Sequence, residues 1–125
     1  MSVGKRLNHT PSSGTSVNHR DHWEIVRELG CCISRDTTTV TIHHCHGASV
    51  IDTWGDLAAV GMAQRQNHYL VIPLAHRYHV GDYGIDYGVG VRSWEKMFDT
   101  QVRHLLWVDE QLDYDIFELA EVPRP

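Results

Sequence analysis

The sequence predicts one small α+β domain, in which two β-strands and a short helix are flanked by an N-terminal and a C-terminal helix. The strands are indicated by a β-branched run at residues 37–43 and an apolar stretch at residues 68–74. The flanking helices are indicated by amphipathic segments at residues 18–29 and 93–112. A chain of 125 residues is long enough for one compact domain and too short for two.

The composition excludes several classes of protein. The formal net charge is −5 with histidine neutral, which argues against a protein that holds nucleic acid by bulk electrostatics alone, although a local basic cleft stays open. The chain has no run of about 18 apolar residues, and its start lacks the apolar segment of a signal peptide. Three cysteines, of which Cys31 and Cys32 are adjacent, form a poor disulfide framework. We therefore expect a cytoplasmic protein without a membrane segment.

The N-terminal part is expected to be a tail followed by a helix. Residues 1–16 are rich in Ser, Thr, Gly and Asn, which is typical of a mobile tail. Asn18 is a suitable N-cap for the helix at residues 18–29, and Gly30 is a suitable residue to end it. The single domain is then expected to span residues 17–112.

The first strand ends in a group of histidines. Alternation along residues 37–43 puts Val40 and Ile42 on the core face, and we expect His43 to leave the strand on the opposite face. Three glycines interrupt residues 47–66, which are expected to be mostly loop with at most a short helix near residues 57–60.

The second strand leads directly into a short helical turn. His76 and His79 lie in this turn, and their i, i+3 spacing places them near one face. Residues 81–90 contain four glycines and are expected to be a flexible connector. A DNA-contacting loop, in which Tyr83 and Tyr87 stack on bases, is the alternative.

The C-terminal part is expected to be a long helix and a tail. Ser93 is a plausible N-cap for the helix at residues 93–112, which has a broad apolar face. Residues 109–121 contain six carboxylates and no basic residue. Residues 113–125 are therefore expected to form an acidic C-terminal tail.

The histidines suggest metal chemistry. The chain has ten, and His43, His44 and His46 lie within four positions that also include Cys45. Imidazole and thiolate are ligands that transition metals accept. Neighbouring side chains at a strand end point to opposite sides, so one of His43 and His44 can bind a metal while the other accepts a proton. Exposed histidines without a ligand role are the alternative.

The order of these blocks resembles the HNH (His-Me finger) nucleases, and more closely the phage RecA-dependent nucleases of the recombination-enhancement (Ref) type. The likeness extends over residues 22–108. It rests on six blocks: Leu29-Gly30-Cys31, Ile42-His43-His44-Cys45-His46-Gly47, Gly61-Met62-Ala63-Gln64-Arg65, Val71-Ile72-Pro73-Leu74, His79 with Gly81, and Trp94-Glu95.

The resemblance implies a ββα-metal core with flanking helices and a metal-dependent DNA endonuclease. His43 falls at a metal-ligand position, His44 at the general base and His79 at the closing metal ligand. Asn67 is the nearest candidate for the middle residue of the motif, which would orient the base loop. His76 is open between ligand, supporting residue and surface residue.

The resemblance also implies the cofactor and the partners. One Mg²⁺ or Mn²⁺ would serve catalysis, and DNA would be the substrate. A phage or prophage origin in a bacterial host and dependence on a RecA-type recombinase filament are also implied. Arg65 and Arg77 flank the site and are candidates for DNA contact, although solvation at the surface explains them nearly as well.

Related proteins often carry a structural zinc ion on two cysteine pairs, and this chain departs from that pattern. Cys31 fits the first position, but Ser34, Ala75 and Tyr78 occupy the other three. Packing around Trp23, Tyr78 and the C-terminal helix can replace the metal. A shifted zinc site is the alternative, drawn from Cys31, Cys32, Cys45, His46 and His76. The departure motivates a second function, a non-catalytic, zinc-stabilised module that binds DNA or protein.

Overall fold

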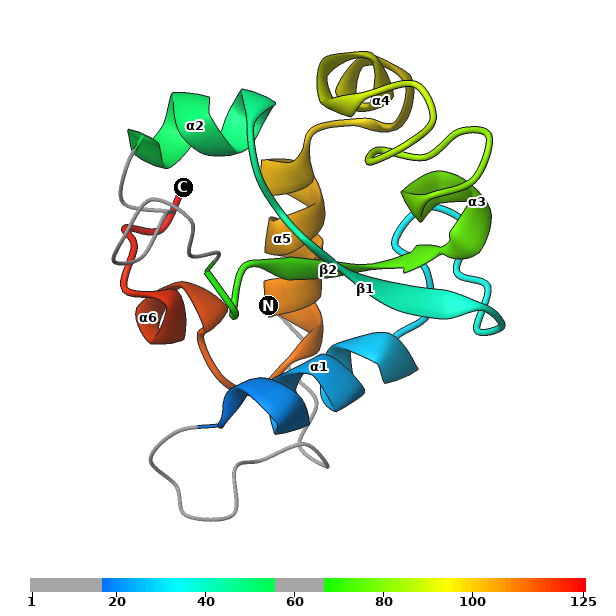
Figure 1. Ribbon diagram of the computed structural model, residues 1–125. Coiled ribbons are helices and arrows are strands. Elements are labelled where there is room, and N and C mark those ends of the chain that lie inside the picture. The colour runs from blue at the N-terminus through cyan, green and yellow to red at the C-terminus, as the bar shows by residue number, and fades with distance from the viewer. Residues whose placement is uncertain (1–16, 56–66) are drawn as a thin grey trace.

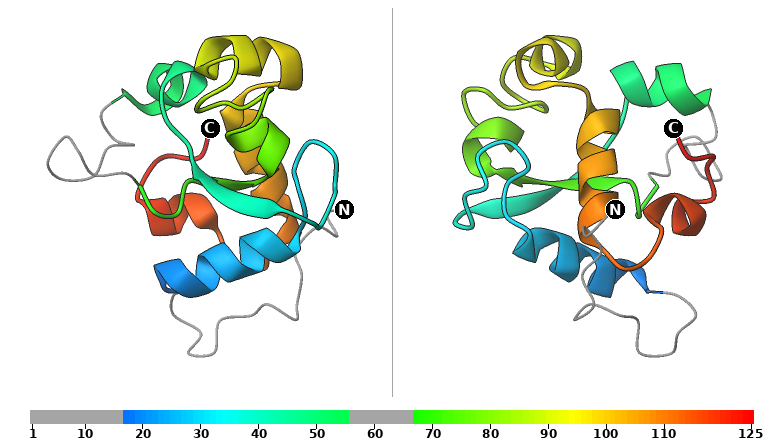
Figure 2. Two further views of the ribbon diagram at one scale, coloured as in Figure 1. Left: turned by 45° about the vertical axis from the view of Figure 1, so that its right-hand side comes forward. Right: turned by 180° about the vertical axis from the view of Figure 1, so that it is seen from behind.

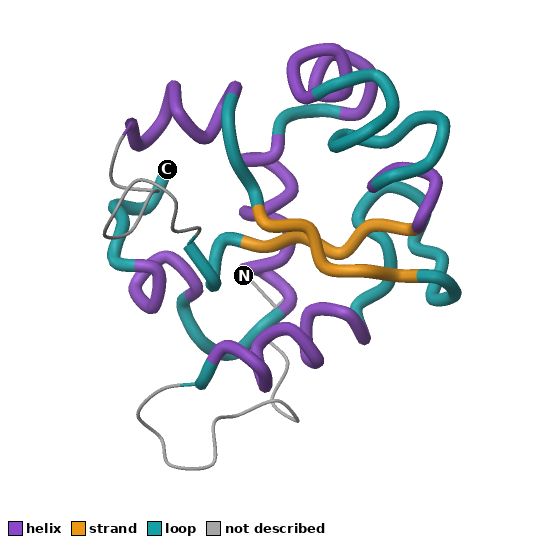
Figure 3. The backbone as a smooth tube through the Cα atoms, in the orientation of Figure 1, coloured by secondary structure: helices purple, strands orange, loops and turns teal. Residues whose placement is uncertain are grey.

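The centre of the molecule is a two-stranded antiparallel sheet of β1 (Val40–His44) and β2 (Val71–Ala75). The computed structural model describes residues 17–55 and 67–125, and six helices surround the sheet within these residues (Figures 1 and 3). The predicted α+β class is confirmed at this level. The expected N-terminal tail and the expected short helix near residues 57–60 lie outside the described residues.

Helices cover the sheet on several sides. Helix α1 (His19–Glu28) contacts both strands, as does the short α3 (His76–His79) that follows β2 directly. Helix α5 (Gln101–Gln111) packs on β2, behind the sheet in Figure 1 and in front of it in the rear view of Figure 2. All five residues of β2 are buried as a result.

Helix α1 begins and ends at the predicted residues. The side chain of Asn18 accepts a hydrogen bond from the backbone N–H of Asp21, which satisfies one of the free donors of the first turn. Gly30 follows the helix with φ +85°, and a Cβ there would lie 3.0 Å from the carbonyl oxygen of Arg35. Only glycine fits that conformation and that close approach.

The two strands lie where they were predicted, with shifted ends. Residues 37–39 are β-branched but do not join β1, because Asp36 Oδ1 accepts hydrogen bonds from both the N–H and the hydroxyl of Thr38. Thr39 then has φ +53°, outside the extended region. This local turn outweighs β-propensity. In the register of the sheet, His43 lies opposite Ile72 and His44 opposite Val71.

Helix α2 (Ala48–Trp54) was not predicted, since residues 47–66 were expected to be mostly loop. Gly47 has φ +68° and starts the helix without a side-chain cap. Val50 and Trp54 are buried on the side that faces the core. Burial of these apolar side chains stabilises a short helix that carries no capping signal in its sequence.

The predicted helix at residues 93–112 is two helices. Helix α4 (Val91–Phe98) starts after Gly90, and α5 starts after Thr100, whose hydroxyl accepts a hydrogen bond from the N–H of Arg103. Asp99, between them, has φ +81°. The apolar stripe continues through the break because both helices pack on one core. Ser93 therefore lies inside α4 and is not an N-cap.

The acidic tail predicted at residues 113–125 is wrong. This segment forms α6 (Ile116–Ala120), whose Ile116 and Phe117 are buried. Its carboxylates have structural tasks. Asp115 caps α6, and the buried Asp109 forms a 2.7 Å ion pair with Arg124. The domain therefore continues to the end of the described chain.

Among the described residues, no helix combines the length and the hydropathy needed to cross a membrane.

Candidate metal centre

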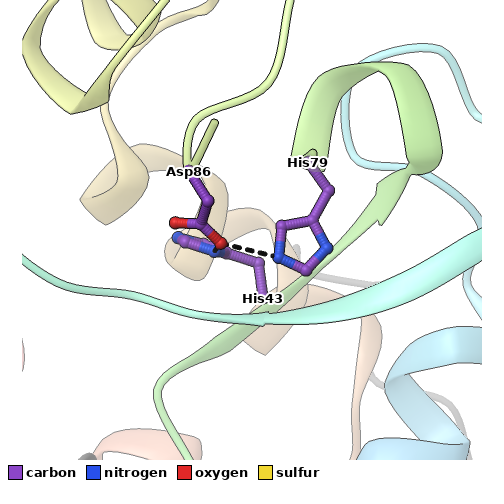
Figure 4. Close-up of side chains that lie close together, drawn as sticks. All are labelled: His43, His79 and Asp86. Carbon is purple, nitrogen blue, oxygen red and sulfur yellow. Dashed lines mark ion pairs between the residues drawn. The ribbon is translucent and has the colours of Figure 1, made fainter. Parts of the chain in front are cut away.

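Three side chains from separate elements converge beside the sheet. They are His43 of β1, His79 of α3 and Asp86 of the following loop, and Figure 4 shows the two rings facing one carboxylate. Asp86 Oδ2 lies 2.9 Å from His79 Nε2 and 3.4 Å from His43 Nδ1. One donor atom from each residue lies within 4.8 Å of the others, which is close enough to share a cation.

His43 is held from behind by an amide. Its Nε2 lies 3.1 Å from Gln101 Oε1, and the backbone N–H of His46 donates to the same oxygen. That N–H identifies the atom as an acceptor, so His43 Nε2 must carry the proton. The neutral ring then presents the Nδ1 lone pair to Asp86.

His79 is held in the matching way by a hydroxyl. Thr41 Oγ1 lies 2.7 Å from His79 Nδ1 and donates its own proton to the carbonyl of Leu74, at 3.3 Å. The hydroxyl therefore accepts from His79 Nδ1–H. The His79 Nε2 lone pair is left to face the carboxylate of Asp86.

The arrangement fits a cation. Two imidazole lone pairs and a carboxylate oxygen repel one another unless a proton or a metal ion lies between them. Metal-binding histidines usually donate their other N–H to an oxygen, as both rings do here. Burial raises the pKa of Asp86, but the contacts of its carboxylate with His43, His46 and His79 outweigh burial and hold that pKa well below its usual range.

His43 was expected to project from the face of the strand opposite the core. Instead its side chain is buried, with 1% of it exposed. The alternation itself is correct, because Thr41 and His43 share the face that contacts His79 and Asp86. That face is covered by the start of α5 and by the loop after α3, so both faces of β1 are partly enclosed.

Sequence reasoning missed Asp86. Residues 81–90 were expected to be a flexible connector, but Gly81, Gly84 and Gly88 are tightly packed against the backbone. A Cβ on Gly84 would lie 2.6 Å from the carbonyl oxygen of His79, and the N–H of Asp86 donates to that same oxygen. Buried Ile85 anchors the loop next to Asp86. An apolar–acidic pair between closely spaced glycines was the available signal.

His46 contributes a fourth polar group. Its Nε2 lies 3.1 Å from Asp86 Oδ1, whereas His43 and His79 pair with Oδ2, and 46% of the His46 side chain is exposed. The hydrogen bond that His46 donates to Asp86 raises the pKa of His46 above its ordinary value. The sequence left open whether His46 structures the loop or binds a metal. In the structure it lies beside the site.

His76 was a candidate metal ligand, left open between ligand, supporting residue and surface residue, and the structure does not bring it to the site. Its side chain is exposed and it does not belong to the three-residue group. Asp86 takes the third position. Arg77 is also exposed and lies over the ring of Tyr78 at 5.2 Å, so its DNA contact stays a prediction. Arg65 lies outside the described residues.

His44 faces the other side of β1. Its Nε2 lies 3.2 Å from His68 Nδ1, and its ring meets the edge of Trp23 on α1. Burial, followed by repulsion from His68, lowers the pKa of His44 to about 4. The ring is therefore neutral at pH 7. Its role as a base stays a prediction.

Asn67 has a structural task rather than a place beside the three ligands. Its amide N–H donates to the carbonyl of Ala120 in α6, and its oxygen accepts from the N–H of Tyr69. These bonds hold the turn that contains His68, which in turn contacts His44. Support of the base loop is thus indirect.

Within the described residues, the structure does not bring the residues of the shifted zinc site together as one ligand group. Cys31, Cys32 and Cys45 are buried free thiols, and within residues 17–55 and 67–125 the group of His43, His79 and Asp86 is the sole set of three or more such ligands. Burial raises the pKa of Cys32 and of Cys45 above the ordinary value of a thiol. Trp23 and Tyr78 pack against the core instead, as the first alternative expected.

Comparison of the chain with models of protein families, with characterised proteins and with solved structures gives no match.

Proposed function

We propose that this protein is a metal-dependent DNA endonuclease of the HNH type, with its cation held by His43, His79 and Asp86. The observation that supports the proposal is the convergence of two oriented imidazoles on one carboxylate. The antiparallel pair of β1 and β2, followed directly by the short helix α3, supports it as well, because a ββα-metal core has this arrangement; here α2 is inserted between the strands.

The donor set favours a transition metal. Two nitrogen donors and one oxygen donor suit Mn²⁺, Zn²⁺, Co²⁺ or Fe²⁺, whereas Mg²⁺ prefers oxygen ligands and keeps much of its water. Of the two ions implied by the resemblance, Mn²⁺ is therefore the better fit. Three protein ligands leave positions for water and a phosphate oxygen.

The side chains around the cation have separate tasks. When bound, the cation supplies a Lewis acid for the phosphate and offsets charge on the leaving oxygen. His44, the last residue of β1, is the proposed base. Because His43 and His44 point to opposite faces, the DNA strand would have to lie across the end of β1 to reach both the cation and His44.

The proposed substrate surface is small. Exposed Arg77 can contact phosphate, and Tyr87, 83% exposed beside Asp86, can stack on a base. A net charge of −5 makes tight DNA binding by this chain alone unfavourable. Delivery of the DNA by a RecA-type recombinase filament would supply the missing affinity.

The test is a cleavage assay on single-stranded, duplex and recombinase-coated DNA with Mg²⁺, Mn²⁺, Co²⁺ or Zn²⁺. We expect cleavage with Mn²⁺, and we expect His79→Ala and Asp86→Asn to abolish it. His76→Ala is the matched control, since it removes an exposed histidine from the same helix and should leave cleavage unchanged. His44→Ala should abolish cleavage while cation binding persists.

Full cleavage by His79→Ala or Asp86→Asn would reject the cation site as the catalytic centre. Full cleavage by His44→Ala would reject the base alone. Greater activity on recombinase-coated DNA would support the filament as a partner, and equal activity on naked DNA would remove it from the proposal.

A non-catalytic, zinc-stabilised binding module is the second candidate, and His46 favours it. With His46 as a fourth ligand the site would be closed, as structural zinc sites are. His46→Ala separates the two functions. A structural four-ligand site would lose most of its zinc affinity and much of its thermal stability, whereas an open catalytic site would keep its cation.

A further inference from the structure

Gln101 is a polar side chain with no exposed surface, and every polar atom of its amide has a partner. Its oxygen lies 3.1 Å from His43 Nε2 and 3.0 Å from the backbone nitrogen of His46. Its nitrogen donates to the carbonyl of His46 at 2.8 Å and to Glu95 Oε2 at 3.1 Å. A buried amide satisfied on all sides is rigid and specific.

The neighbours leave the amide one orientation. The His46 N–H requires an acceptor, and the His46 carbonyl and the Glu95 carboxylate require donors. Rotation of the amide by 180° would turn its NH₂ group toward the His46 N–H, so that two donors face each other. It would also turn its oxygen toward the His46 carbonyl and the Glu95 carboxylate, so that acceptors face each other. The oxygen therefore always faces His43, and His43 always carries its proton on Nε2 when neutral.

Glu95 anchors the amide from the other end. Its Oε2 also accepts from the backbone N–H of Gln101 at 2.9 Å, and its Oε1 accepts from the N–H of Ser49 at 3.2 Å. The carboxylate thus joins the first turns of α2 and α5 to α4. The position of Gln101 depends on three helices and not on one side-chain rotamer.

We propose that Gln101 is a positioning residue of the cation site: it holds His43 in the tautomer and orientation that direct the Nδ1 lone pair at the cation. The proposal rests on the cation site of the proposed function. A carboxamide or carboxylate oxygen behind a metal-binding histidine orients the ring and increases its basicity. Gln101 itself contacts neither the cation nor the substrate.

The test compares two changes at one position. Gln101→Met removes both the acceptor and the donors, so we expect affinity for Co²⁺ to fall about 10- to 100-fold. Gln101→Glu keeps an oxygen behind His43, but its second carboxylate oxygen faces the carboxylate of Glu95 and repels it. We expect Gln101→Glu to lose stability in the metal-free protein and to bind Co²⁺ at least as tightly as the wild type.

The measurements are Co²⁺ affinity by calorimetry, the visible absorption bands of bound Co²⁺, and urea unfolding in the presence of a chelator. Gln111→Met is the control for the chemical change, because it alters the same residue type at the far end of α5. Val102→Ala is the control for lost stability, because it truncates a buried neighbour in α5 that touches no ligand.

The outcomes separate a positioning role from a structural one. Loss of Co²⁺ affinity in Gln101→Met, with affinity retained in Gln101→Glu and in both controls, supports the proposal. If affinity falls in step with stability in all the destabilised variants, Gln101 is only structural and the proposal fails. Wild-type affinity in Gln101→Met overturns it while the cation site stands, and absence of Co²⁺ binding by the wild type overturns both. If Gln101→Glu does not fold, the comparison of Gln101→Met with Val102→Ala decides.

Discussion

Acid should destabilise this protein through a histidine that lies outside the cation site. His22 of α1 is fully buried, with Nε2 3.1 Å from the carbonyl oxygen of Tyr69 and Nδ1 2.8 Å from the hydroxyl of Tyr114. The carbonyl requires a donor, so the neutral ring carries its proton on Nε2 and accepts from Tyr114. Burial lowers the pKa of His22 from 6.5 to about 4.

The sign and size of the effect follow from proton linkage. Because the folded pKa is depressed, the unfolded chain binds more protons between pH 6.5 and about 4. The contribution of His22 to stability is fully present above pH 6.5 and is lost as the pH falls. The loss in the free energy of unfolding is about 2 kcal/mol at about pH 5 and about 3 kcal/mol at about pH 4.

The assay is urea unfolding from about pH 4 to pH 8 in a chelator, for the wild type and for His22→Gln. Glutamine can donate to Tyr69 and accept from Tyr114, but it does not titrate. Every other titrating group is common to both proteins and cancels in the difference. We expect the wild type to lose stability more steeply with acid. Parallel curves of the free energy of unfolding against pH would refute the reasoning. They would show that the pKa of His22 is the same in the folded and unfolded states.

Three further changes test separate parts of the structure. Thr41→Val removes the acceptor behind His79 and should weaken Co²⁺ binding about 10- to 100-fold, whereas Thr41→Ser should not; equal affinities by calorimetry would show that the hydroxyl is dispensable. Asn67→Ala leaves the carbonyl of Ala120 without its donor and should cost about 1–3 kcal/mol in urea unfolding with Co²⁺ affinity unchanged, and a loss of affinity would return Asn67 to the site. Phe117→Ala should cost about 3–5 kcal/mol, and a cost near zero would mean that the C-terminal segment is a tail after all.

Local signals in the sequence were sufficient for part of the fold. The caps of α1 at Asn18 and Gly30, and the positions of the two strands, follow from short-range preferences that the tertiary structure keeps. Strand alternation also placed Thr41 and His43 on one face correctly. Short-range signals failed where packing decides, as in α2, which has no side-chain cap and is stabilised by burial of its apolar side chains.

The candidate site divides in the same way. The sequence by itself placed His43 at the end of a strand and His79 on the turn after the next strand, so two of the three ligands could be predicted. Only the tertiary structure made Asp86 the third candidate ligand, buried His43 and put Gln101 behind it, 58 positions along the chain. The physical reason is that strand and helix periodicity determine which way a side chain points, whereas a ligand set depends on which distant segments pack against that face.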